Sequence, residues 1–139
     1  MTALNPYLNF DGNCEEAFEF YKSVFGGEYG DVNRFSEMPG DEISPADANK
    51  ILHISLPVGE SQLLMGSDRI EGMPSTNFGD SITVSVGPNS AEEGSRIFEA
   101  LSEGGTVTMP YERQFWGADY GSCVDRFGIN WMVNYAPAD

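Results

Sequence analysis

One pattern occurs twice along this chain of 139 residues. Each copy has an alternating stretch, a capping pair for a helix, an apolar stripe at helical spacing and a double glycine that ends the helix. The capping pairs are Asn13 with Glu16 and Ser90 with Glu93, and the double glycines are residues 26–27 and 104–105. The sequence therefore predicts two modules, each with one strand, one helix and three further strands.

This repeat predicts an α+β protein of two tandem βαβββ modules. We expect one domain over residues 1–139, with module one at 1–67, a linker at 68–80 and module two at 81–139. A four-stranded sheet with one helix leaves its other face uncovered, so we expect a curved mixed sheet around a shared cavity. The expected strands are residues 4–10, 28–35, 51–58, 61–67, 81–86, 106–109, 115–124 and 129–134.

Alternation predicts which strand residues face the helix and which face away from it. Leu8 and Phe10 should face the helix, as should Leu52, Ile54 and Leu56. In the last hairpin we expect a tight turn at residues 125–128 that pairs Val124 with Ile129. The residues predicted to line the cavity are Asn5, Tyr7, Asn9, His53, Ser55, Leu63, Met65, Ser81, Thr83, Ser85, Asp119, Cys123, Asn130, Met132 and Asn134.

The charge of the chain excludes some partners. The 22 Asp and Glu residues against 7 Lys and Arg residues give a net charge of -15 at pH 7. Such a charge repels nucleic acids and anionic membranes, so we expect neither as a partner. The chain has no basic, apolar leader and no long apolar run, which indicates a cytoplasmic protein. Cys14 and Cys123 lack metal-ligand spacing, and we expect no disulfide between them.

His53 and Asp119 are the candidate catalytic residues. His53 is the only histidine of the chain, and Asp119 is the acid expected nearest to it, so the two would form a general base and its orienting group. A strand histidine without a chemical task is an equally open interpretation. The candidate ligand-binding residues are Tyr7, Asn9, His53, Ser55, Met65, Thr83, Arg113, Phe115, Trp116 and Met132.

Residues 111–116 follow a proline and should form the lip of the cavity. Arg113 would bind a carboxylate or phosphate, while Phe115 and Trp116 would offer a flat apolar surface. The alternative is that these side chains pack against a partner subunit.

Five blocks of the sequence, in order, resemble the PhnB-like branch of the glyoxalase/bleomycin-resistance, or vicinal oxygen chelate, superfamily. They are residues 8–21, 25–27, 109–110, 115–117 and 125–131. The resemblance covers essentially the whole chain and implies a glyoxalase-like fold and a homodimer. Members of the branch are named by similarity to glyoxalases or to a demethylubiquinone methyltransferase.

Metal-dependent members of this superfamily carry ligands on four strands, and the matching positions here are Asn5, Met65, Ser81 and Met132. An amide, a hydroxyl and two thioethers are poor ligands for zinc, nickel or iron, so no metal or other cofactor is predicted. We expect the chain to bind a small, partly apolar molecule in the cavity. The alternatives are a metal-dependent lyase or dioxygenase of the glyoxalase type, and a structural homodimer with a filled core.

Overall fold

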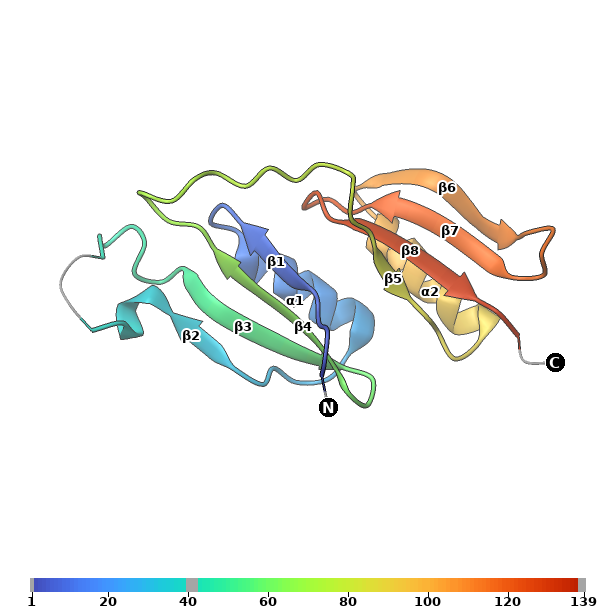
Figure 1. Ribbon diagram of the computed structural model, residues 1–139, viewed down its shortest axis with the longest axis horizontal. Coiled ribbons are helices and arrows are strands. Elements are labelled where there is room, and N and C mark those ends of the chain that lie inside the picture. The colour runs from blue at the N-terminus through green and yellow to red at the C-terminus, as the bar shows by residue number, and fades with distance from the viewer. Residues whose placement is uncertain (1, 40–42, 138–139) are drawn as a thin grey trace. The chain divides into compact units, whose positions relative to one another are not determined.

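A computed structural model describes residues 2–39 and 43–137 of the chain (Figure 1). The described chain divides into two compact units, Met1–Asn77 and Phe78–Asp139. Each unit has one four-stranded mixed sheet and one long helix, with strand order β1-β4-β3-β2 in the first and β5-β8-β7-β6 in the second. The predicted α+β fold with two tandem βαβββ modules is therefore confirmed.

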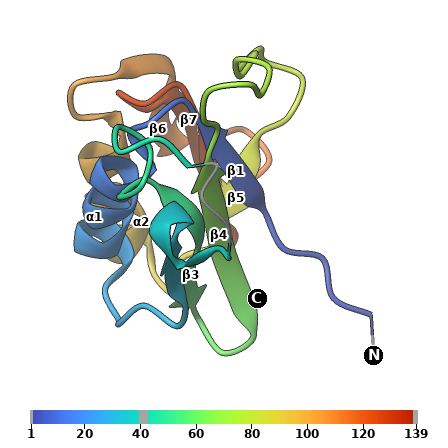
Figure 2. The ribbon, with the colours of Figure 1, turned by 90° about the vertical axis from the view of Figure 1, so that its left-hand side faces the viewer.

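In the first unit β1 runs parallel to β4, and β4, β3 and β2 are antiparallel to one another. Figures 1 and 2 show α1 lying on one face of this sheet. The elements are β1 (Tyr7–Phe10), α1 (Cys14–Phe25), β2 (Val32–Arg34), a 3-10 turn (Phe35–Glu37), β3 (Ile51–Val58) and β4 (Gln62–Asp68).

The second unit repeats this arrangement, since β5 runs parallel to β8 and the remaining pairs are antiparallel. The edge strand β6 continues through Pro110, beyond the expected strand end at residue 109, because an edge strand tolerates a residue without an N–H donor. The elements are β5 (Val84–Val86), α2 (Ala91–Ser102), β6 (Thr106–Arg113), β7 (Asp119–Val124) and β8 (Asn130–Tyr135).

The core of the first unit lies between α1 and its sheet. The helix buries Phe18 and Tyr21, and the sheet buries Leu8, Phe10 and Leu64. Gly66 of β4 lies so close to α1 that a Cβ atom there would be 2.6 Å from the Phe18 ring. A glycine is therefore required where the helix meets the sheet.

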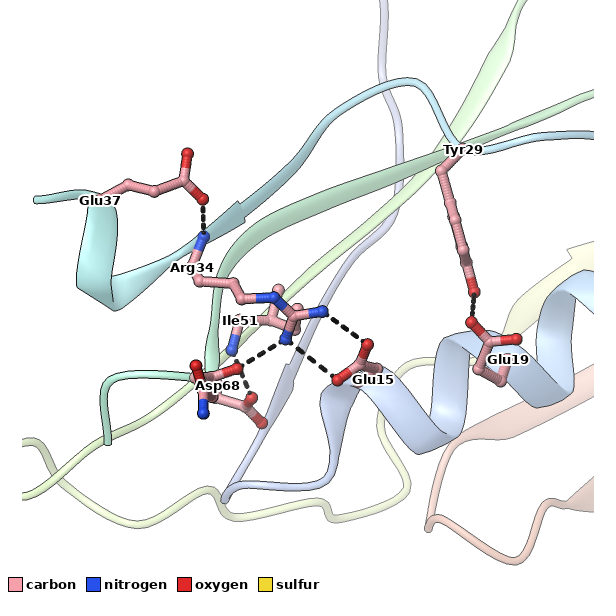
Figure 3. Close-up of polar contacts among 8 residues, drawn as sticks. Glu15, Glu19, Tyr29, Arg34, Glu37, Ile51 and Asp68 are labelled. Carbon is pink, nitrogen blue, oxygen red and sulfur yellow. Dashed lines mark hydrogen bonds and ion pairs between the residues drawn. The ribbon is translucent and has the colours of Figure 1, made fainter. Parts of the chain in front are cut away.

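Asp68 at the end of β4 holds the start of α1 and the start of β3 together. Its Oδ1 accepts hydrogen bonds from the backbone N–H groups of Gly12 and Cys14, both at 2.9 Å, and its Oδ2 accepts one from Ile51 at 2.9 Å. Figure 3 shows the contact with Ile51 beside the Arg34–Glu15 ion pair. The expected cap was wrong, because the side chain of Asn13 makes no capping hydrogen bond.

In the second unit the predicted cap is confirmed, since Ser90 Oγ accepts a hydrogen bond from the Glu93 N–H at 3.1 Å. The helix α2 buries Ile97, Phe98 and Leu101, and the sheet buries Trp131 and Val133. The two thiols, Cys14 and Cys123, are free and buried, and burial raises the pKa of Cys123 to about 11.

The register of the last hairpin differs from the expected one. Val124 pairs with Asn130 rather than Ile129, because the Asp125 carboxylate accepts hydrogen bonds from the N–H groups of Phe127 and Ile129 and so lengthens the turn by one residue. A shift of one residue turns every side chain of a strand to the other face. Asp119 and Cys123 therefore lie on the buried side of β7, and Tyr120, Ser122 and Val124 lie on the opposite side.

Two further expectations, one for the start of β3 and one for the start of β5, differ from the structure. Ile51 is fully buried and Leu52 is half-buried, the reverse of the prediction, because the pairing of β2 with β3 shifts by one residue there. In the second unit Ile82 is 78% exposed, since β5 begins only at Val84. Ser81 and Thr83 consequently lie outside the strands.

Candidate functional site

The face of the first sheet that points away from α1 carries polar and aromatic side chains, and we call it the first averted face. Tyr7 and Ser55 both pair with Met65, which places these three side chains in one row. A second row contains Asn9 beside Ser67 and Asn33 beside His53. The pairing of Ile54 with Gly66 brings His53 next to Ser67, so the second row is continuous. The prediction that Tyr7, Asn9, His53, Ser55 and Met65 share a face is confirmed.

Tyr7 and His53 are in direct contact on this face. The Tyr7 hydroxyl lies 3.1 Å from His53 Nδ1. Their rings are stacked, with centroids 5.7 Å apart and planes inclined by 26°. Tyr7 is 43% exposed and His53 is half-buried. The two side chains thus form an accessible, hydrogen-bonded pair that crosses β4.

Ser55 and Asn5, which were also predicted to line the cavity, accept hydrogen bonds from backbone groups of the first unit. Ser55 is 4% exposed, and its Oγ accepts a hydrogen bond from the Asp31 N–H at 2.9 Å. Asn5 Oδ1 accepts one from the Leu63 N–H at 3.0 Å. These two polar groups fix neighbouring segments of the first unit to its sheet.

The second averted face, on the side of the second sheet away from α2, carries an equivalent row. Ser85 and Ser122 both pair with Met132, as Tyr7 and Ser55 pair with Met65. The Ser122 hydroxyl lies 2.7 Å from the Thr108 hydroxyl. Ser122 was not predicted because of the register shift at the β7–β8 turn. Thr108 lies at an irregularity in the pairing of β6 with β7, between Val107 and Met109. The signal that was overlooked is Asp125, whose carboxylate accepts bonds from N–H groups two and four residues later, as in an Asx turn.

Asp119 does not lie on the averted face of its sheet, where its proposed role as the partner of His53 required it. It is 8% exposed on the buried side of β7, and its Oδ1 accepts a hydrogen bond from Arg113 Nε at 2.6 Å. This bond also raises the pKa of Arg113. The register that directed Asp119 toward His53 is wrong, and Asp119 is instead the partner of Arg113.

The turn between β6 and β7 presents two exposed aromatic rings. Phe115 is 97% exposed and Trp116 is 54% exposed, with ring centroids 5.0 Å apart in an edge-to-face arrangement. Trp116 also contacts Tyr120 edge-on, at 6.2 Å. Their role as the lip of a cavity stays a prediction.

Within residues 2–39 and 43–137, no three His, Cys, Asp or Glu side chains are grouped so as to hold a metal ion. Of the four positions that match the metal-dependent relatives, Met65 and Met132 lie on strands, Asn5 is bonded to Leu63, and Ser81 is exposed outside the strands. An amide, a hydroxyl and two thioethers do not fit zinc, nickel or iron. The part of the chain described also has no helix long and apolar enough to cross a membrane.

A family model described as 3-demethylubiquinone-9 3-methyltransferase matches residues 2–134. The curated protein YjdN of Escherichia coli is 30% identical, and the match covers 94% of this chain and 93% of YjdN. The crystal structure of protein PA1353 from Pseudomonas aeruginosa is 39% identical, with a TM-score of 0.87 and 98% of each chain covered.

The fold extends to a glyoxalase-related enzyme from Fulvimarina pelagi. That structure has a TM-score of 0.67 to this chain at 16% identity, covering 99% of this chain and 90% of the other. At this identity the match shows the fold alone.

Proposed function

This chain belongs to the 3-demethylubiquinone-9 3-methyltransferase family, the PhnB-like branch of the glyoxalase/bleomycin-resistance superfamily, and we propose that it binds a small, partly apolar molecule without a catalytic metal. The binding surfaces in this proposal are the two averted faces, each taken within its own unit. The proposal is one of binding, and it assigns no reaction.

The observation that carries the proposal is the accessible Tyr7–His53 pair beside Met65. Such a surface offers a flat ring for stacking, a thioether for apolar contact and polar atoms that orient a ligand. Binding sites for small molecules typically combine apolar lining with a few convergent polar groups. The Met132, Ser122 and Thr108 side chains give the second averted face the same combination.

The side chains at the four positions that match the metal-dependent relatives support binding without a metal. Catalytic zinc sites use three imidazole, carboxylate or thiolate ligands, and the four matching positions supply none of these. Met65 and Met132 occupy equivalent places in the two rows, where their flexible thioethers suit contact with an apolar group.

The name of the family suggests a quinone as the first ligand to test, and a ubiquinone has an uncharged planar ring and an apolar tail. A ubiquinone analogue with a short alkyl tail is therefore a suitable probe. At a concentration of 100 times its dissociation constant, a ligand stabilises the folded protein by about 2.7 kcal/mol. For a chain of this size we expect thermal unfolding to shift upward by roughly several degrees.

The experiment compares metal-stripped wild-type protein with Tyr7→Phe and Tyr29→Phe. Tyr29 is a matched control, because its hydroxyl also has one side-chain partner, Glu19, at 3.0 Å (Figure 3). We expect the probe to stabilise the wild type and the Tyr29 variant, and to stabilise the Tyr7 variant less. No shift with any organic probe would favour a structural protein with a filled core, and a shift with one metal ion alone would favour a glyoxalase-type lyase or dioxygenase.

The homodimer implied by the resemblance is also a proposal. Light scattering of the purified protein tests it, and a mass near twice the chain's 15.2 kDa is expected.

A further inference from the structure

The Tyr7–His53 contact limits the state of the imidazole. A neutral histidine carries its proton on one ring nitrogen, and the other nitrogen accepts hydrogen bonds. Tyr7 Oη lies 3.1 Å from Nδ1, so one of these two atoms donates to the other. A phenol is a stronger hydrogen-bond donor than a neutral imidazole N–H, and the lone pair of an unprotonated Nδ1 is a good acceptor. This favours a Tyr7 hydroxyl that donates to Nδ1 and an imidazole that carries its proton on Nε2.

The Nε2 atom is available to a ligand. In the part of the chain that the structure describes, His53 has no second hydrogen bond, and Nε2 is not among the buried polar atoms that lack a partner. Tyr7 and His53 are both partly accessible. An Nε2–H group at this place is therefore a hydrogen-bond donor that water or a ligand can reach.

The residues that border His53 on the first averted face are uncharged, although the chain as a whole is strongly acidic. Tyr7 faces it from β1, Asn33 from β2 and Ser67 from β4. A carboxylate, that of Glu37, accepts hydrogen bonds from Asn33 Nδ2 at 3.3 Å and from the Arg34 N–H at 2.6 Å. The two rows of the first averted face contain no acid, lysine or arginine. Their residues are Tyr7, Met65, Ser55, Asn9, Ser67, His53 and Asn33.

We propose that Tyr7 holds His53 in the Nε2–H form, and that this pair recognises an uncharged planar ligand through a carbonyl oxygen of the quinone type. The ligand oxygen accepts the hydrogen bond from Nε2, and the ligand ring lies against the accessible Tyr7 ring. This inference rests on the proposed function and adds the chemical class of the ligand. An anionic ligand is disfavoured, because no cationic side chain lies in the two rows and the net charge is -15.

The state of His53 is measured directly, because the chain contains a single histidine. Nitrogen-15 NMR of histidine-labelled protein, recorded at alkaline pH where the imidazole is neutral, reports which ring nitrogen carries the proton. We expect Nε2 to be protonated in the wild type and in Tyr29→Phe. In Tyr7→Phe the ring stack remains and the hydroxyl is lost, so we expect a mixture of both forms. A proton on Nδ1, or the same spectrum for Tyr7→Phe and wild type, would overturn the inference even if a ligand binds.

The ligand class is tested with three probes of similar size: the short-tailed quinone, its hydrocarbon counterpart without carbonyl groups, and a counterpart with a carboxylate. We expect the quinone to bind about tenfold more tightly than either counterpart, which corresponds to one ordinary hydrogen bond. Equal affinity for the quinone and the hydrocarbon would overturn the role of Nε2. If Nε2 is protonated and no probe binds, the proposed function fails, and the assignment of a ligand fails with it.

Discussion

Trp131 Nε1 donates a hydrogen bond to Asp125 Oδ2 at 2.8 Å. The same carboxylate accepts two backbone hydrogen bonds through Oδ1, from Phe127 at 2.8 Å and from Ile129 at 3.1 Å. Asp125 is 3% exposed and Trp131 is 1% exposed. One buried carboxylate thus sets the length of the β7–β8 turn and ties it to the core, which determines the side of β7 on which each residue lies.

Replacement of Asp125 by asparagine should destabilise the second unit. The amide nitrogen cannot accept a hydrogen bond, so at least one buried N–H donor is left without its partner. We expect a loss of about 2–3 kcal/mol in the free energy of unfolding, measured by urea titration. The exposed Asp80→Asn is the control and should change stability by less than about 0.5 kcal/mol. Equal stability of the two variants would contradict the role given to Asp125.

Asp68→Asn should weaken the first unit, because the Asp68 carboxylate accepts three backbone hydrogen bonds. Asp68 is 3% exposed and accepts hydrogen bonds from Gly12, Cys14 and Ile51. We expect a loss of about 2–4 kcal/mol and faster hydrogen exchange at these amides. The exposed Asp11, which accepts from the Thr76 N–H, provides the control variant Asp11→Asn, with an expected loss below about 1 kcal/mol. Unchanged hydrogen exchange at the Cys14 and Ile51 amides in the Asp68 variant would disprove the role given to Asp68.

Gly66→Ala tests how closely α1 packs on its sheet. The new Cβ would meet the Phe18 ring at 2.6 Å and the Leu8 carbonyl oxygen at 3.0 Å, so helix and sheet must separate. We expect a destabilisation of about 1–3 kcal/mol in denaturant titrations. Gly87→Ala is a matched control, because a Cβ there would have nothing within 4 Å. A Gly66 variant as stable as the Gly87 variant would show that the helix lies farther from β4.

The Glu15–Arg34 ion pair should make stability depend on pH (Figure 3). The hydrogen bond from Arg34 lowers the pKa of Glu15 from 4.5, so the pair stabilises the fold above about pH 4.5 and stops doing so as the pH falls through the lower, folded-state pKa. Both side chains are partly exposed, and solvent screening limits the effect to about 0.5–1 kcal/mol.

Urea titrations of Glu15→Gln at pH 7 and at about pH 3 measure this dependence. The difference from wild type should be present at pH 7 and shrink in acid. Glu16→Gln, in the same helical turn, is the control and should show a smaller difference at pH 7. A difference from wild type that is constant with pH would exclude this ion pair as its source.

Regular alternation made much of the first averted face predictable. Leu8 and Phe10 are buried while Tyr7 and Asn9 lie on the other side, and His53, Ser55 and Met65 lie there with them. The double glycines also indicated correctly where both helices end, to within two residues. These features depend on local periodicity, which a single sequence displays directly.

The errors concern contacts between residues far apart, or turns that side chains rearrange. The acceptor at the start of α1 is Asp68, which lies 54 residues beyond Cys14 in the sequence. The last hairpin was predicted as a tight turn, and the Asp125 carboxylate lengthens it. No periodicity in the sequence marks a side chain that satisfies distant backbone donors, so Asp119 and Cys123 were assigned to the wrong face.

Titration calorimetry with the short-tailed quinone tests the central claim most directly. Metal-stripped protein is titrated with a chelator present, and again after addition of Mn²⁺, Ni²⁺, Zn²⁺ or Fe²⁺. We predict saturable binding with the chelator present, at an affinity that none of the four ions improves by as much as about tenfold, which is 1.4 kcal/mol. Binding that requires one of the ions would contradict the account and would make a metal-dependent enzyme the leading interpretation.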